Sequence, residues 1–68
     1  MKQVAISDFL TDAEIEKAIK LKSQKAVREQ IIEPNIERIN QTLGQENDPA
    51  YLAYAVEYVL RRAGYWKD

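Results

Sequence analysis

The strongest constraint on the fold lies between Asp48 and Gly64, where independent helix signals coincide. Asp48 can cap a first helical turn, and Pro49 fits the first helical position because its missing N–H would have no partner there. Gly64 is typical of the left-handed residue that follows the last turn. These signals predict a helix over about 49–63.

The predicted helix 49–63 carries apolar or aromatic residues on two opposite sides. On a 3.6-residue wheel, one arc is aliphatic and is expected to face the core; it holds Leu52, Val56, Val59, Leu60 and Ala63. The roughly opposite arc is aromatic and basic, and it holds Tyr51, Tyr54, Tyr58, Arg61 and Arg62. Three interpretations of the second arc remain open: a helix sandwiched between other helices, a partner-binding face, or tyrosines that simply lie on the surface.

A second helix start lies near residue 12. Thr11 and Glu14 have the spacing of a capping box, and Leu10 and Ile15 occupy the two positions of a hydrophobic staple. Acidic residues precede basic ones in this segment, which suits the helix macrodipole. We predict a helix over about 12–22.

The middle of the chain should not be one straight helix from 12 to 43, because its apolar residues fall on two differently directed stripes. Ser23 can cap a new helix over about 24–32. Pro34 then requires either a kink or a restart, since proline fits a first turn but clashes in a helix interior. The last of these helices is expected over about 34–43, ended by Gly44.

The two ends are expected to lie outside the main helices. Residues 1–10 form an arm in which Val4 and Ile6 allow a short strand, although a tail docked on the helices fits equally well. In the tail 64–68, Trp66 should fold back onto the core because an exposed Trp would leave a large apolar surface in water. The predicted fold is all-α, with residues 1–68 as a single helical domain built as a small bundle of three to four helices.

The absence of two residue types restricts the chemistry. The chain has no Cys and no His, so disulfides and thiolate metal sites are ruled out and the commonest metal ligand and general base are missing. The only glycines are Gly44 and Gly64, too few for a phosphate-binding loop. We therefore expect no enzymatic activity, no catalytic residues, no bound cofactor and no metal.

Opposite charges gather in separate segments of the chain. Residues 17–28 include five basic residues and no acidic one, among them the candidate nucleic-acid contacts Lys17, Lys20, Lys25 and Arg28. Lys17, Lys20, Gln24 and Arg28 would form one ridge if the helix ran through. Glu29, Glu33 and Glu37 would share a face if their helix were continuous, and the basic ridge could be their partner.

Two classes of function fit these surfaces. The leading hypothesis is a protein-interaction or regulatory module that acts through the Tyr51, Tyr54, Tyr58, Arg61 and Arg62 face, pairing with itself as a homodimer or with another protein. The alternative is a small nucleic-acid-binding protein with a helix-turn-helix across 12–32. No apolar run is long enough to span a membrane and the N-terminus does not resemble a secretory signal, so a cytoplasmic location is expected.

Overall fold

The computed structural model describes residues 5–66, and all regular structure in that range is helical. The elements are a short 3-10 turn η1 (Ile6–Asp8), α1 (Asp12–Leu21), α2 (Gln24–Val27), a π turn η2 (Arg28–Ile32), a 3-10 turn η3 (Glu33–Asn35), α3 (Ile36–Leu43) and α4 (Pro49–Arg62). The prediction of an all-α fold is confirmed. None of the described helices combines the length and the apolar character that crossing a membrane requires.

The first helix begins and ends as the sequence predicts. The Glu14 N–H donates to Thr11 Oγ1 at 3.2 Å, and the Thr11 N–H donates to Glu14 Oε1 at 2.9 Å, which completes the capping box. Lys22 ends α1 in the left-handed conformation, with a φ of 52°. Ser23 then caps α2 by accepting the Ala26 N–H at 3.2 Å, so the break expected at Ser23 is confirmed.

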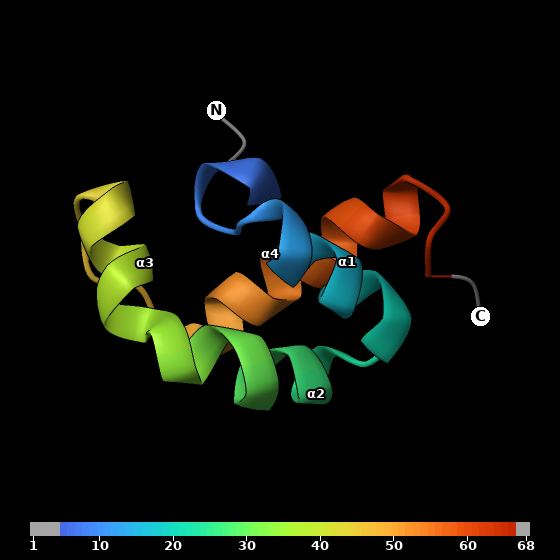
Figure 1. Cartoon of the computed structure of the whole chain (residues 1–68), viewed down its shortest axis with the longest axis horizontal. Helices are drawn as coiled ribbons and strands as arrows, with labels where there is room; N and C mark the ends of the chain where they lie inside the picture. Colours follow the sequence, from blue (N-terminus) through green and yellow to red (C-terminus); the bar gives the residue numbers. More distant parts are fainter. Residues whose placement is uncertain (1–4, 67–68) are drawn as a thin grey trace.

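From α2 to α3 the backbone bends but does not restart (Figure 1). The predicted helices 24–32 and 34–43 are therefore one helical stretch, whose turns change type on both sides of Pro34. Pro34 has no N–H to donate, and the following residue, Asn35, leaves the helical region with a φ of −118°. The Asn35 side chain donates from Nδ2 to the Ile31 carbonyl at 2.7 Å, which satisfies an acceptor next to the kink.

The N-terminal segment belongs to the core from residue 6 onward. Ile6, Phe9 and Leu10 are all buried, and Ile6 lies in a 3-10 turn. The possible strand is therefore wrong for Ile6, while Val4 lies outside the described residues. The docked alternative is correct because residues 6, 9 and 10 have the helical i, i+3, i+4 spacing, which turns three apolar side chains to one side.

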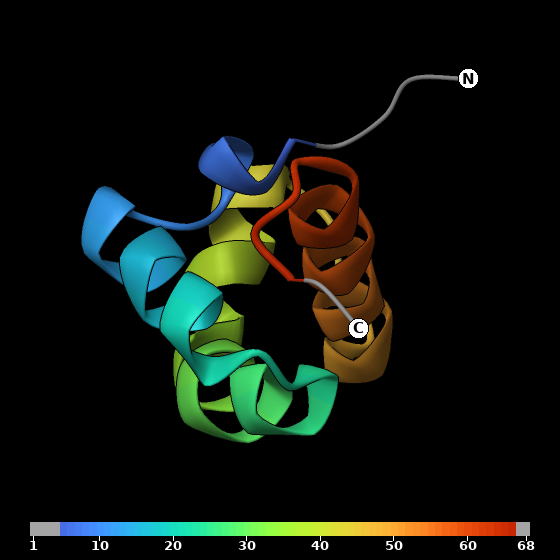
Figure 2. The same ribbon diagram turned by 90° about the vertical axis from the view of Figure 1, so that its right-hand side faces the viewer.

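Figure 2 shows α4 along one side of the molecule and α1 along the other. The side chains between them form one buried cluster, with partly buried residues packed around it. The largest contributors are Phe9, Val27, Ile31, Ile32, Ile39, Leu52, Val56, Leu60 and Trp66. The radius of gyration of 11.0 Å matches the value of about 11 Å expected for a compact chain of this length.

The core side of α4 differs slightly from the predicted arc. Leu52, Val56 and Leu60 are buried as expected, and Val59 is partly buried. Ala63 is exposed, so its assignment to the core is wrong. The reason is that Ala63 is the C-cap of α4, where the chain turns away toward Gly64.

The chain end closes over the core as predicted for Trp66. Gly64 adopts a left-handed φ of 88°, and the Tyr65 N–H donates to the Leu60 carbonyl at 2.9 Å, as in a Schellman motif. This turn directs Trp66 inward, where it is only 4% exposed. Its indole Nε1 donates to the Ala18 carbonyl at 3.0 Å and so ties the end of the chain to α1.

Candidate protein-interaction surface

The outer side of α4 carries the candidate site, which we call the tyrosine face; its residues are Tyr51, Tyr54, Tyr58, Arg61 and Arg62. Tyr51 and Tyr54 are each 57% exposed and Tyr58 is 41% exposed. Across the same helix, Leu52 and Val56 are 1% and 0% exposed. The interpretation of α4 as a sandwiched helix is therefore wrong, because one of its two apolar sides faces solvent.

The position of α4 in the fold leaves this face open. In Figure 2, α4 stands at one edge of the molecule, and no other described element lies on its outer side. Its contacts with the rest of the chain are made chiefly to α2, η2 and η1. The tyrosine face is thus a continuous surface along a well-packed helix.

Contacts within α4 hold the C-terminal part of the tyrosine face. The Arg62 guanidinium lies over the Tyr58 ring, 5.5 Å from its centroid, and its Nη1 donates to the Tyr58 hydroxyl at 3.4 Å. Arg61 Nε donates to Glu57 Oε2 at 2.9 Å. Glu57 Oε1 also accepts from Gln24 Nε2 at 2.7 Å, so this carboxylate connects α4 to α2.

Tyr65, in the tail after Gly64, is a further exposed aromatic residue. It is 53% exposed. The helical wheel did not identify it because Gly64 ends the helix, and wheel positions have no meaning beyond that point. Its side chain nevertheless adds aromatic surface near the end of α4, directly after Gly64 in the chain.

The basic residues of 17–28 do not form the continuous ridge that a single helix would give. The left-handed Lys22 ends α1, so Lys17 and Lys20 lie on a different helix from Lys25. All three of these lysines are exposed. The basic ridge, which required one helix running through 17–28, is therefore not formed.

The acidic residues 29, 33 and 37 are also exposed, but they lie on a stretch whose turns change from π to 3-10 to α. The stretch is unbroken, but its changing turns mean that residues four apart do not keep to one regular helix face. One contact does join the two charged segments, because Arg28 Nε lies 3.5 Å from Glu33 Oε2. Both side chains are partly exposed, at 38% for Arg28 and 51% for Glu33, so this pair adds little to stability.

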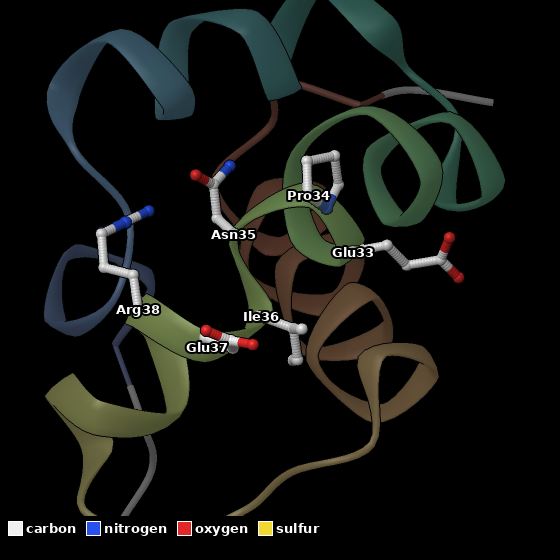
Figure 3. Close-up of a pocket in the computed structure, with 6 residues that line it drawn as sticks. All are labelled: Glu33, Pro34, Asn35, Ile36, Glu37 and Arg38. Carbon is white, nitrogen blue, oxygen red and sulfur yellow. The ribbon is translucent and has the colours of Figure 1, made fainter.

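A hollow at the kink is the other surface feature that could hold a ligand (Figure 3). Six consecutive residues line it: Glu33, Pro34, Asn35, Ile36, Glu37 and Arg38. Their polar groups do not converge, since Figure 3 shows Glu33 pointing away from Asn35 and Arg38. Asn35 is bonded to Ile31, and Arg38 is bonded to Glu14 at 2.8 Å and 2.9 Å, so these groups stabilise the fold.

The described part of the chain contains no group of three or more acidic side chains placed to hold a metal ion. Comparison with known proteins found no matching family model, no similar curated protein and no similar solved structure. The function must therefore be inferred from the surfaces of this chain itself.

Proposed function

We propose that this chain is a small, non-catalytic protein-interaction module, built on a bundle of three to four helices, that self-associates through the tyrosine face. The observation that carries the proposal is the exposure of Tyr51, Tyr54 and Tyr58 on a helix whose opposite side is buried at Leu52, Val56 and Leu60. Tyr and Arg are the residue types that contribute most often to binding hot spots. Here they lie along one helix face, where a partner helix could cover all of them at once.

The size of the chain supports a second copy as the partner. A domain of about this length buries only about 60% of the surface of its unfolded chain, which makes an isolated monomer marginal. Pairing removes further apolar and aromatic surface from water, and two-fold dimers are the commonest assemblies of identical chains. The exposed rings of Tyr51 and Tyr54 supply such surface.

The experiment compares Tyr54→Asp with a control by sedimentation velocity over a wide concentration range. The wild-type mass should rise toward that of two chains, whereas Tyr54→Asp should remain a monomer because a carboxylate replaces the ring at the middle of the face. The matched control is Ala13→Asp, which makes the same change of charge at an exposed position in the first turn of α1. Circular dichroism verifies that both variants are folded.

Two results would contradict this function. One is a wild-type chain that remains monomeric at millimolar concentration. The other is a folded Tyr54→Asp variant that associates as strongly as the wild type, because association would then use a different surface.

The second candidate function is nucleic-acid binding by the α1–α2 corner. Lys17, Lys20 and Lys25 are exposed on both sides of a tight helix–turn–helix junction, and no ion pair joins them to another described residue. Phosphate contacts of this kind would weaken steeply with added salt. The net charge of −1 counts against a dedicated nucleic-acid domain.

Fluorescence anisotropy with labelled single-stranded and duplex DNA tests the second candidate. Binding at low salt that is lost in the double variant Lys20→Glu, Lys25→Glu would support it. Arg28 is left unchanged because it is only partly exposed and lies next to Glu33. No anisotropy change with either DNA at low salt would remove this candidate.

A further inference from the structure

The spacing along the tyrosine face contains information about how two copies would pair. Tyr51, Tyr54, Tyr58 and Arg61 follow one another at steps of three, four and three residues. This is the a, d, a, d spacing of a two-helix coiled-coil seam. Because the steps are the same from either end, two copies of α4 can pair in either direction.

On the basis of the self-association proposed above, we propose that two copies of α4 pair antiparallel about a two-fold axis level with Val56. In this arrangement Tyr54 packs against the partner's Tyr58 at the centre. Tyr51 packs against the partner's Arg61 at each end, which places a guanidinium beside an aromatic ring. A guanidinium beside an aromatic ring is a favourable contact where the seam is partly shielded from water.

The charges on one flank of the seam are complementary in the same arrangement. Asp48, the N-cap of α4, precedes Ala55 by seven residues, and Arg62 follows Ala55 by seven, so the three lie along one flank of the helix. Antiparallel pairing sets Ala55 beside its own copy and Asp48 opposite the partner's Arg62 at both ends. Asp48 and Arg62 are both exposed. Asp48 uses Oδ1 to accept the Ala50 N–H at 2.8 Å, so its second oxygen can accept from an arginine.

Parallel pairing would bring like charges close to each other. It would bring Arg61 against the partner's Arg61 in the seam and align the two helix macrodipoles side by side. Its ion pair would join Glu57 to the partner's Arg62. That carboxylate is already bonded to Gln24 at 2.7 Å and to Arg61 at 2.9 Å, so it has little to gain from a further partner.

The residues on the two flanks of the seam are small enough for the two copies of α4 to approach each other. Ala50 is exposed and Ala55 is partly exposed, and both are small. The 14 residues of α4 span about 21 Å, which is short for a stable interface. The pairing is therefore a weak, concentration-dependent dimer, and the orientation must be measured at high protein concentration.

Distances between spin labels distinguish the two orientations. The chain has no Cys, so Ala55→Cys and Ala50→Cys each carry a single label. In the antiparallel dimer, Ala55 lies one residue from the level of the axis and Ala50 lies six residues from it. The Ala50 labels are then offset along the helix by about 18 Å and the Ala55 labels by about 3 Å. In a parallel dimer neither pair is offset, and the two distances are similar.

Pulsed electron paramagnetic resonance should therefore give a clearly longer distance for Ala50→Cys than for Ala55→Cys. Similar distances for both variants would overturn the antiparallel orientation but leave self-association intact. A monomeric mass with no dipolar coupling in either variant would overturn both. A dimer whose Ala55 labels are far apart would also overturn the proposed pairing.

A mixed sample provides a second measurement in case a label at Ala55 blocks association. One batch is labelled at Ala50→Cys and the other at Ala63→Cys, which is an exposed position at the end of α4. Antiparallel pairing brings these two labels to nearly the same level. Parallel pairing separates them by about 20 Å along the helix. Each batch is also measured alone, and a long distance that appears only on mixing would contradict the proposal.

Discussion

At the residue scale, Trp66 connects distant parts of the chain. Its ring is buried, and its Nε1 bonds to the Ala18 carbonyl, which lies 48 residues away in the sequence. Glu14 also connects distant parts of the chain, because its carboxylate accepts from the Thr11 N–H and from Arg38. Because Glu14 and Arg38 are partly solvated, we expect Trp66 to contribute more to stability.

Replacing Trp66 by Phe should lower the free energy of unfolding by about 1–3 kcal/mol, because the core loses volume and the bond to Ala18 is lost. Urea denaturation followed by circular dichroism measures the change. Tyr65→Phe is the control, since its exposed side chain should change stability by about 0.5 kcal/mol or less. Equal stability of Trp66→Phe and the wild type would mean that the indole is not anchored as described.

At the scale of the elements, the helix ends explain where the chain turns. Lys22 is the C-cap of α1 and Gly44 is the C-cap of α3, and both residues have a positive φ, of 52° and 75°. Lys22 is the only residue other than glycine with this conformation in the described range. An L side chain in the left-handed region costs roughly 1–2 kcal/mol. The end of α1 is therefore strained, whereas the end of α3 is not.

Lys22→Gly and Gly44→Ala should change the free energy of unfolding in opposite directions. Lys22→Gly should stabilise the fold by about 0.5 kcal/mol, because the strain it removes exceeds the extra backbone entropy of a glycine in the unfolded chain. Gly44→Ala should destabilise the fold by about 1 kcal/mol through backbone strain alone, since a Cβ there would contact nothing within 4 Å. Thermal and urea unfolding measure both variants, and changes of the same sign would contradict this account.

At the scale of the whole molecule, the fold leaves one side of its last helix in water. The core is a single cluster, and α4 closes it from one side only. The tyrosine rings are 41–57% exposed, so much of their apolar surface is not used to stabilise the isolated chain. If two chains pair through this face, their association stabilises the folded state by mass action.

The urea midpoint of the wild type should therefore rise with protein concentration. A hundredfold increase should add up to about 1.4 kcal/mol per chain where the dimer is the main folded species. The midpoint of Tyr54→Asp should not depend on concentration, because its association is removed. A wild-type midpoint that stays constant up to millimolar concentration would indicate that the folded chain does not associate.

Local interactions explain how much of the fold could be predicted from the sequence. The helix starts at Thr11 and Asp48 and the ends at Gly44 and Gly64 depend on residues within a few positions of each other, so short sequence patterns contain them. The solvent side of α4 was also visible as an arc on the helical wheel. The exposure of this side to solvent could not be predicted, because three interpretations fitted the same arc.

Only the tertiary structure decided what depends on distant parts of the chain. The path through Pro34 is a kink rather than a restart, with the π turn next to it and the Asn35 bond to Ile31. The burial of Phe9 and the contact of Trp66 with Ala18 depend on how the helices pack, which no local pattern contains. The sequence by itself determined the helix boundaries at Thr11, Ser23, Gly44, Asp48 and Gly64, since caps and turns are local. Packing decided that no other part of the described chain covers the second apolar side of α4, and it left the tyrosines exposed.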